Sequence, residues 1–358
     1  MKKVICFIED LNAGGAERQL TGLAVLLKEA GYNVEVWTYY PGDFYLPILL
    51  AANVKYRCIR NAQCKIMRIP VLYRELRKAS PDTVIAYLDT ACLIACLIKA
   101  LGLKFNLIVS ERNTTQQLSF RERIKFSLYR FANHIVPNSY TQTEFIKRHY
   151  PHLGDKLTCI TNFVDTDKFK PSDCIYHLAD KPLHILTVAR IMPQKNVLNY
   201  IDAIKKVVDC GYKITVDWYG QSFDGLYYTQ CSDAIRTHKL ENIFQFFPPK
   251  SNIIAEYQTA NLFCLPSYYE GFPNVVCEAM CCGLPIVCSN VCDNSMIISN
   301  QNNGLLCDPY SIDDFADKII KFIDSTIIVK QEMSVLSRRI AINMFSEKAF
   351  VDKYARII

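Results

Sequence analysis

Short apolar runs alternate with stretches in which apolar residues recur at helical spacing, along the whole chain. This alternation is typical of a parallel β-sheet covered by helices. The pattern opens with a strand over residues 4–8 and a helix over about 17–30. One face of that helix is apolar, with Leu20, Leu23, Ala24 and Leu27. Gly31 follows directly, and a glycine at this place commonly adopts the left-handed conformation that ends a helix.

The same alternation runs twice, on either side of a loop-rich stretch at 165–182. The first series predicts strands over 34–37, 83–87, 107–110 and 134–137, besides 4–8. The second predicts strands over 183–188, 213–218, 243–247, 262–265 and 285–288. We therefore expect an α/β fold of two doubly wound domains, 1–165 and 180–345, facing each other across a cleft. Ligands of open α/β sheets bind beyond the carboxyl ends of the strands, so the cleft is the expected site.

The length and composition fit two globular cores and exclude disordered, collagen-like and coiled-coil chains. The chain has 358 residues, of which 50% are hydrophobic and 21% charged, and its formal net charge is +6. Residues 1–160 hold 22 basic and 13 acidic side chains, and the remainder holds 19 and 22. A polyanion or an anionic membrane surface would therefore meet the front half.

Sixteen cysteines would indicate a disulfide framework only in a small secreted protein. The amino-terminal run has no signal-peptide pattern, and no apolar run reaches about 18 residues, the length of a membrane span. These features predict a cytosolic protein with reduced thiols. The cysteines over 277–292 include no Cys-x-x-Cys pair and no nearby histidine, so we expect no zinc site.

The most informative segment follows the strand over 262–265 and begins Glu270-Gly271-Phe272-Pro273-Asn274. Gly271 permits an unusual turn, Pro273 suits a first helical position, and a helix is expected from Asn274. A helix start favours an anion. Glu270, and Glu278 one turn into the helix, are suited to accept hydrogen bonds from sugar or ribose hydroxyls. The alternative is an ordinary helix with an acidic start and a solvent-facing glutamate.

Two cations stand at the carboxyl end of the strand over 183–188. Arg190 and Lys195 lie in the loop before the next helix, where they could hold a diphosphate, arginine through a two-donor fork and lysine as a point charge. The alternative is a solvated loop with two surface charges.

Together these residues resemble a known family. Arg190-x4-Lys195 and the segment from Glu270 to Pro285 are similar to the retaining, nucleotide-sugar-dependent glycosyltransferases of family 4, which have the GT-B fold, in their bacterial surface-polysaccharide branch. Further similar segments are Gly14–Arg18, Ser110–Asn113, Asn162–Phe169 and Asn303–Leu306, the last corresponding to a loop in the family. Phe163 and the segment Gly220–Phe223 depart from the family's glycines.

The resemblance implies a role for each matching residue. Arg190 and Lys195 would bind the donor diphosphate, and Glu270 would contact the transferred sugar. The backbone of Gly271, Phe272, Pro273 and Asn274 would hold the sugar's hydroxyls, and Glu278 the ribose. Gly15 would let the backbone approach the donor phosphate or the acceptor. Contacts to acceptor or sugar are expected from Glu17, Glu111 and Arg112, although Glu111 and Arg112 could instead form a structural ion pair. A final helix over about 346–358 would pack back on the first domain.

The family's retaining mechanism needs no histidine, since the leaving phosphate can take the acceptor's proton. Asp165-Thr166-Asp167 resembles a metal-binding Asp-x-Asp but does not follow a strand of a nucleotide-binding half. We therefore expect neither a required metal nor a cofactor.

Two basic stretches in the front half indicate a membrane surface. Eight cations lie at Lys55, Arg57, Arg60, Lys65, Arg68, Arg74, Arg77 and Lys78. A helix near 120–131 would align Phe120, Ile124, Leu128 and Phe131 among further cations. This suits an interfacial helix on an anionic leaflet, although the stripe could instead pack on the protein's own sheet. No nucleic-acid recognition motif is present.

These observations predict a retaining glycosyltransferase, peripheral at the inner face of the cytoplasmic membrane. It would move a hexose or N-acetylhexosamine from a nucleoside diphosphate sugar, a UDP-sugar by resemblance, to a lipid-linked oligosaccharide in capsule, O-antigen or exopolysaccharide synthesis. The alternatives are a sugar-nucleotide epimerase with the same fold and a catalytically silent nucleotide-sugar-binding protein. A dehydrogenase fits less well because the Gly-x-Gly-x-x-Gly spacing is missing.

Overall fold

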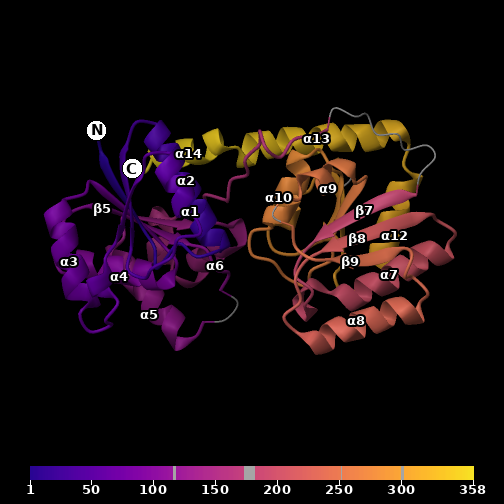
Figure 1. The fold of residues 1–358 in the computed structure, drawn as a ribbon, viewed down its shortest axis with the longest axis horizontal. Helices are drawn as coiled ribbons and strands as arrows, with labels where there is room; N and C mark the ends of the chain where they lie inside the picture. Colours follow the sequence, from indigo (N-terminus) through magenta and orange to yellow (C-terminus); the bar gives the residue numbers. More distant parts are fainter. Residues whose placement is uncertain (116–117, 173–181, 251, 300–301) are drawn as a thin grey trace. The chain divides into compact units, whose positions relative to one another are not determined.

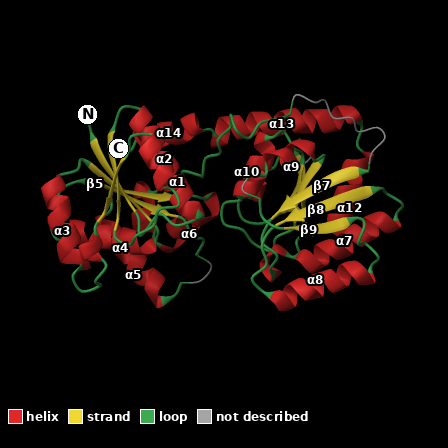
Figure 2. Ribbon diagram, in the orientation of Figure 1, coloured by secondary structure: helices red, strands yellow, loops and turns green. Residues whose placement is uncertain are grey.

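The chain folds into two compact units, each built on its own parallel sheet (Figures 1 and 2). The computed structural model describes residues 1–115, 118–172, 182–250, 252–299 and 302–358. Unit 1 comprises Met1–Phe163 and Glu347–Ile358, and unit 2 comprises Val164–Ser346. Within the described ranges, no helix is both long and apolar enough to cross a membrane.

Unit 1 contains a six-stranded sheet in the order β3-β2-β1-β4-β5-β6, with every neighbouring pair parallel. Its strands are β1 Lys3–Phe7, β2 Asn33–Thr38, β3 Lys55–Cys58, β4 Thr83–Tyr87, β5 Asn106–Glu111 and β6 His134–Pro137. The central strands are buried on both faces, as the continuous apolar runs predict.

Helices cover both faces of the unit 1 sheet (Figure 2). They are α1 Gly15–Glu29, α2 Leu46–Ala51, α3 Arg68–Ala79, α4 Asp89–Ala100, α5 Phe120–Leu128, α6 Tyr140–His149 and α14 Glu347–Ala355, with 3₁₀ turns at Arg60–Ala62, Tyr129–Phe131 and Pro151–Lys156. The carboxyl-terminal α14 packs against α1. The ring of Phe163 packs at a tilt against Phe350 of α14, with 4.9 Å between the ring centroids, and fills space that a side chain at Gly22 would occupy. The phenylalanine therefore packs, partly buried, against the core of unit 1 at the position where the sequence departs from the family's glycine.

Unit 2 repeats the plan with a parallel sheet in the order β12-β11-β10-β7-β8-β9. Its strands are β7 Leu183–Val188, β8 Ile214–Tyr219, β9 Phe244–Phe247, β10 Leu262–Leu265, β11 Ile286–Ser289 and β12 Gly304–Cys307. Its helices are α7 Val197–Asp209, α8 Gly225–Thr237, α9 Ile254–Thr259, α10 Asn274–Cys281, α11 Asn294–Ile297, α12 Ile312–Asp324 and α13 Ile327–Phe345, with a 3₁₀ turn at Pro193–Lys195.

All ten predicted strands are present, and the two doubly wound sheets confirm the predicted fold class. The sequence analysis missed β3 and β12, which are edge strands. β3 reads Lys-Tyr-Arg-Cys and lacks an apolar run. β12 lies where a loop was expected over 303–306, and that expectation was wrong. A Cβ at Gly304 would overlap the carbonyl oxygen of Ile286, so this glycine permits the close pairing of β12 with β11.

The strand orders reverse at one point in each sheet. In unit 1 the reversal lies between β1 and β4, and in unit 2 between β10 and β7. Loops that leave the carboxyl ends of two such strands diverge to opposite sides, and ligands of open α/β sheets bind there. The residues that follow β1, β4, β7 and β10 are therefore the positions to inspect.

Candidate functional site

A charged pair bridges the two loops at the reversal point of unit 2. Lys195 ends the 3₁₀ turn that follows β7, and Glu270 follows β10. The Nζ of Lys195 lies 2.6 Å from Oε1 of Glu270, and their side chains are 12% and 9% exposed. The structure thus brings together two residues that the sequence analysis assigned separately to diphosphate and to sugar. At this point the nearly buried ammonium can bind an anion, and the nearly buried carboxylate can accept a hydrogen bond from a hydroxyl.

Side-chain amides hold the two loops against each other. Asn196, at φ 56°, donates its amide to the carbonyls of Pro266 and Pro309 at 3.1 and 2.8 Å. The Gln194 amide donates to the Tyr269 carbonyl at 2.8 Å, and the Gln194 carbonyl accepts from the N–H of Tyr268 at 2.9 Å. These bonds fix the Lys195–Glu270 geometry without a ligand.

Arg190 lies in the same loop and is exposed. The indole N–H of Trp218 donates to the carbonyl of Ala189, the residue before it, at 2.7 Å. A Cβ at Gly220 would overlap that same carbonyl oxygen. Gly220 therefore allows β8 to lie against the Arg190 loop, although the segment after it departs from the family pattern.

Helix α10 begins at Asn274, as predicted, but its first turn is partly closed. The N–H of Asn274 donates to the Phe272 carbonyl at 3.0 Å, and the Phe272 side chain packs on Phe345 at 5.7 Å. Glu278 is 6% exposed, and its Oε2 accepts from the Tyr257 hydroxyl at 3.2 Å. The alternative of a solvent-facing Glu278 was therefore wrong. Burial of a carboxylate at this place costs free energy unless donors satisfy it.

At the reversal point of unit 1, α1 starts with glycines after β1. A Cβ at Gly15 would meet no atom within 4 Å, so packing alone does not require a glycine there. Burial raises the pKa of the Glu17 carboxyl against the opposing effect of its own backbone N–H, and the charges of Asp10 and Glu9 raise it further.

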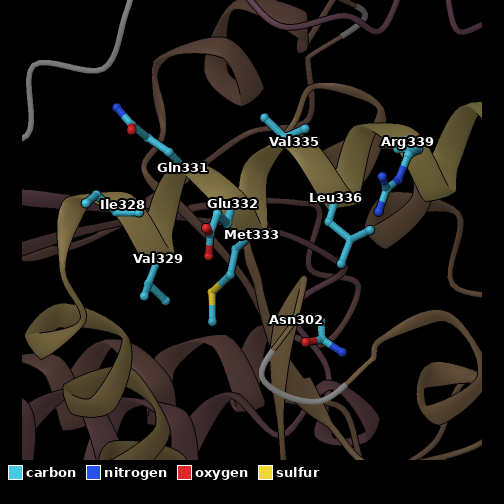
Figure 3. Close-up of a pocket in the computed structure, with 9 residues that line it drawn as sticks. All are labelled: Asn302, Ile328, Val329, Gln331, Glu332, Met333, Val335, Leu336 and Arg339. Carbon is cyan, nitrogen blue, oxygen red and sulfur yellow. The ribbon is translucent and has the colours of Figure 1, made fainter.

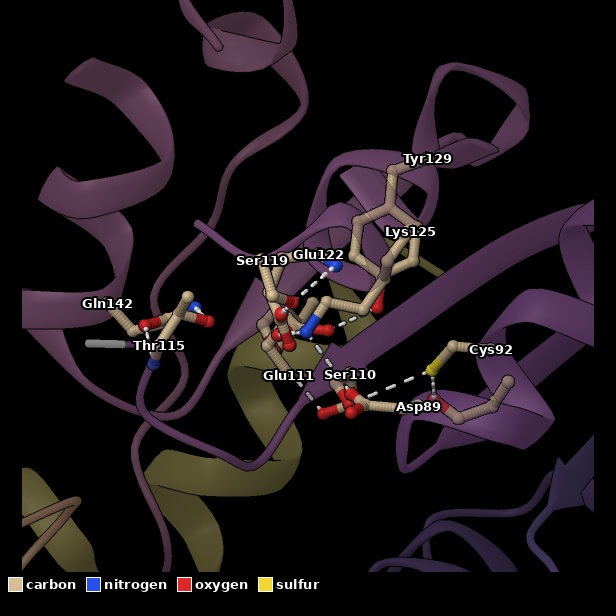
Figure 4. Close-up of polar contacts among 12 residues, drawn as sticks. Asp89, Cys92, Ser110, Glu111, Thr115, Ser119, Glu122, Lys125, Tyr129 and Gln142 are labelled. Carbon is tan, nitrogen blue, oxygen red and sulfur yellow. Dashed lines mark hydrogen bonds and ion pairs between the residues drawn. The ribbon is translucent and has the colours of Figure 1, made fainter. Parts of the chain in front are cut away.

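Glu111 and Arg112 do not pair with each other, so the alternative of an ion pair between them was wrong. The side chain of Glu111 is fully buried, where it meets Lys125 and the Tyr129 hydroxyl (Figure 4). It has no exposed oxygen for the predicted contact with sugar or acceptor. Arg112 donates to Asn162 at 2.8 Å and to the hydroxyls of Tyr354, at 2.9 Å, and Tyr87.

The cationic surface of unit 1 also differs from the sequence-based expectation. Arg68 is 8% exposed, stacks on Tyr39 at 4.4 Å, and donates to the carbonyls of Ala62 and Gln63, so it supports the core. On α5 the alternative of a stripe packed on the protein's own sheet was wrong for the first half of the helix. Phe120 and Ile124 are 80% and 45% exposed.

No group of three or more histidine, cysteine, aspartate or glutamate side chains with metal-site geometry occurs among the described residues. The cysteines there are free thiols. Asp165 accepts hydrogen bonds from the N–H groups of Asp167 and Lys168 at 3.2 and 2.9 Å, which closes a turn. Its role in the structure is local.

A surface pocket of about 470 Å³ lies along α13 in unit 2 (Figure 3). Met333 and Leu336 point from the helix toward Asn302. None of its lining residues comes from the loops after β7 or β10, so this pocket is separate from the Lys195–Glu270 site.

Two family models match the chain on either side of the boundary between the units. Residues 13–168 match Glycosyltransferase Family 4, and residues 174–336 match Glycosyl transferases group 1. The chain belongs to these family 4 glycosyltransferases, as the motifs predicted, and it is a glycosyltransferase.

Curated relatives are identical to this chain at about a quarter of the aligned residues. An Escherichia coli UDP-Gal:alpha-D-GlcNAc-diphosphoundecaprenol alpha-1,3-galactosyltransferase is 28% identical over 211 residues, 55% of this chain and 52% of its own length. A Campylobacter jejuni GalNAc-alpha-(1->4)-GalNAc-alpha-(1->3)-diNAcBac-PP-undecaprenol alpha-1,4-N-acetyl-D-galactosaminyltransferase is 26% identical over 334 residues, 86% of each chain. The Anabaena protein Alr3699/HepE, solved in complex with UDP, superposes with a TM-score of 0.85 at 20% identity, over 99% of each chain. The fold is GT-B.

Proposed function

We propose that the protein is a retaining glycosyltransferase that moves a hexose or N-acetylhexosamine from a UDP-sugar to a lipid-linked oligosaccharide in bacterial surface-polysaccharide synthesis. The Lys195–Glu270 pair carries the proposal, because it sets a cation and a carboxylate 2.6 Å apart at the reversal point of unit 2. The two bacterial relatives support the lipid-linked acceptor, since their names specify diphosphoundecaprenol or PP-undecaprenol substrates. The first name specifies UDP-Gal, and the Anabaena structure holds UDP.

In this proposal the leaving diphosphate draws on fixed positive charge. Lys195 and Arg190 hold its oxygens and neutralise the charge that develops as the bond to the sugar breaks. The backbone around Gly271 and the Glu270 carboxylate hold the sugar's hydroxyls. Glu278 accepts from the ribose.

The acceptor hydroxyl attacks the same face that the diphosphate leaves. The bond from the anomeric carbon to the phosphate oxygen breaks, the bond to the acceptor oxygen forms, and the acceptor's proton passes to the departing phosphate. This sequence needs no histidine and, in our proposal, no divalent metal.

We also propose that unit 1 contacts the inner leaflet of the cytoplasmic membrane. Two apolar sites among cations lie on segments that leave carboxyl ends of the unit 1 sheet: Ile66, 86% exposed beside Lys65, and Phe120, 80% exposed beside Arg121. Apolar side chains inserted among cations bind anionic lipid.

The first test is thermal unfolding with UDP, GDP, ADP and NAD, each at millimolar concentration. A ligand at about 100 times its dissociation constant stabilises by roughly 2.7 kcal/mol, and we expect this shift with UDP alone. A shift with NAD alone would contradict the proposal.

The second test offers UDP-galactose, UDP-glucose and their N-acetylated forms with N-acetylglucosamine on a short polyprenyl diphosphate. Transfer with the anomeric configuration of the donor retained, read by NMR, is the expected result. Interconversion of the UDP-sugar without the acceptor would indicate the epimerase. UDP binding without turnover of any donor would indicate the silent binding protein.

A further inference from the structure

The carboxyl edge of unit 1 carries a second charged group, at its own reversal point. Asp89 is separated from the end of β4 by Leu88 alone and is the first residue of α4. Because the sheet order reverses between β1 and β4, Asp89 and the glycine loop before α1 flank the position where an open α/β sheet binds a ligand. Unit 2 places Lys195 and Glu270 in the corresponding relation to β7 and β10.

A buried lysine holds one oxygen of Asp89. The Nζ of Lys125, on α5, lies 3.2 Å from Oδ1 of Asp89 and 2.9 Å from Oε2 of Glu111 (Figure 4). The Tyr129 hydroxyl donates to the other oxygen of Glu111. Side-chain exposure is 3% for Lys125 and 0% for Glu111, but 22% for Asp89. Within this network, solvent therefore reaches the side chain of Asp89 but not that of Glu111.

The backbone before Asp89 is strained. Leu88 has φ 70° and ψ 156°, a conformation that a side chain disfavours and that glycine tolerates. This strain sets the direction in which the chain leaves β4, and with it the place of the Asp89 carboxylate. Strained backbone persists where the surrounding structure enforces it, which occurs preferentially at ligand sites.

We infer that Asp89 contacts the acceptor, and that Lys125 and Glu111 are its positioning residues. The inference rests on the proposed function. The Asp89 carboxylate accepts a hydrogen bond from the hydroxyl that attacks the donor sugar and so orients that hydroxyl. The proton still leaves with the departing phosphate.

The charges of the network favour a neutral hydroxyl over a phosphate. Two carboxylates face one ammonium, so the group has a net negative charge when all three are ionised. Burial tends to lower the pKa of Lys125, but the charges of Glu111 and Asp89 outweigh it and raise this pKa above its usual value. The lysine stays charged and fixes Asp89. The Asp89 carboxylate would itself repel a diphosphate, whereas a sugar hydroxyl can donate to this partly exposed group.

A purely structural ion pair is the competing explanation. It predicts that loss of the Asp89 charge lowers stability and affects every activity alike. A contact to the acceptor predicts a selective loss, in which donor binding and slow donor hydrolysis by water persist while transfer falls.

The test compares Asp89→Asn with Asp82→Asn, the same change at the other end of β4. Asp82 precedes the strand, and its carboxylate accepts from the Lys3 N–H at 2.7 Å. The probe is N-acetylglucosamine on a short polyprenyl diphosphate, with the UDP-sugar that the wild-type protein uses. We expect Asp89→Asn to lower kcat/KM for the probe about 100-fold, with the UDP-induced melting shift and donor hydrolysis within twofold of wild type. Asp82→Asn should transfer normally.

The outcomes separate the inference from the proposed function. Wild-type protein that binds no UDP, or does not glycosylate the probe, refutes the proposed function and with it the inference. Wild-type protein that glycosylates the probe, together with an Asp89→Asn variant that does so at an unchanged rate, refutes the role of Asp89 alone. An Asp89→Asn variant that loses UDP binding and donor hydrolysis in parallel with transfer also overturns it, in favour of the structural ion pair.

Discussion

The ammonium of Lys195 lies 2.6 Å from the carboxylate of Glu270, although 75 residues separate them in the chain. The contact exists because β7 and β10 are neighbours where the sheet order reverses. Their loops are held by Asn196 and Gln194 before any ligand arrives. Groups that are fixed in advance stabilise developing charge without the cost of reorganising.

Removal of either partner of this pair should damage both activity and stability. Lys195→Met or Glu270→Gln should lower transfer by at least about 100-fold, as expected for loss of a group that stabilises transition-state charge. Each change also leaves its nearly buried partner without its ion pair, which costs about 3 kcal/mol of unfolding free energy. Steady-state kinetics and urea unfolding of each variant measure the two effects.

The double variant Lys195→Met/Glu270→Gln is the control. It should recover most of the stability lost in Lys195→Met, because no unpaired charge remains, and none of the activity. If the loss of stability in the double variant equals the sum of the losses in the two single variants, the two side chains are not coupled.

A substitution at Gly220 tests whether the close packing of β8 holds the loop that carries Arg190 in place. Gly220→Ala places a Cβ into the carbonyl of Ala189, so the loop that carries Arg190 must move. We expect a loss of about 2 kcal/mol of stability, in the range for overpacking, and weaker UDP binding by calorimetry. Gly225→Ala is the matched control, since its Cβ meets no atom within 4 Å at the start of α8. Equal effects of the two changes would contradict the proposed support.

The central strands and the helix starts could be predicted because they depend on local patterns. Apolar runs such as 83–87 and 262–265 are buried whichever strand lies beside them, and Pro273 fixes the start of α10. Their positions after predicted strands indicated Arg190, Lys195 and Glu270 one by one, and the resemblance implied a role for each. Their direct contact could not be predicted, because it depends on strand order, which the chain does not display locally.

The misreadings in unit 1 have the same cause. A carboxylate at the end of β5 suggests a ligand contact. Glu111 instead forms an ion pair with Lys125, which lies on α5, the next helix along the chain. That pairing turns the Lys125 side of α5 inward, together with Phe126. Phe120 consequently faces outward, against the alternative in which the apolar stripe packs on the sheet.

Cys64 should be the first thiol to react with iodoacetamide among the described cysteines. It is exposed, and the backbone N–H groups of Met67 and Ile66 lower its pKa. More of it is therefore thiolate at neutral pH, and the thiolate is the nucleophile. Cys210 is the control, because it is also exposed. Burial raises the pKa of Cys281 to about 12, so that thiol should react only after unfolding. Peptide mapping at pH 7 gives the order, and faster labelling of Cys210 would contradict it.

Chelation should leave transfer unchanged. In the proposed mechanism Lys195 and Arg190 would provide the positive charge that the departing diphosphate needs, and no step would require a divalent ion. We expect activity in 5 mM EDTA within about twofold of the untreated protein. A loss of activity that Mg²⁺ or Mn²⁺ restores would show that a metal takes over this role.

Binding of unit 1 to lipid should depend on the exposed face of α5. Phe120→Ser/Ile124→Ser removes two apolar side chains, each worth roughly 1.5–3 kcal/mol when fully buried from water. Partial insertion of both should account for at least a tenfold loss of binding to vesicles of phosphatidylglycerol, read by sedimentation.

Phe223→Ser is the matched control, since Phe223 is 76% exposed but lies in unit 2. Higher salt should weaken the wild-type protein's binding by screening the cations near Phe120. Equal losses in the two variants would show that exposed aromatic residues bind lipid regardless of place, and no loss in either would remove α5 from the membrane contact.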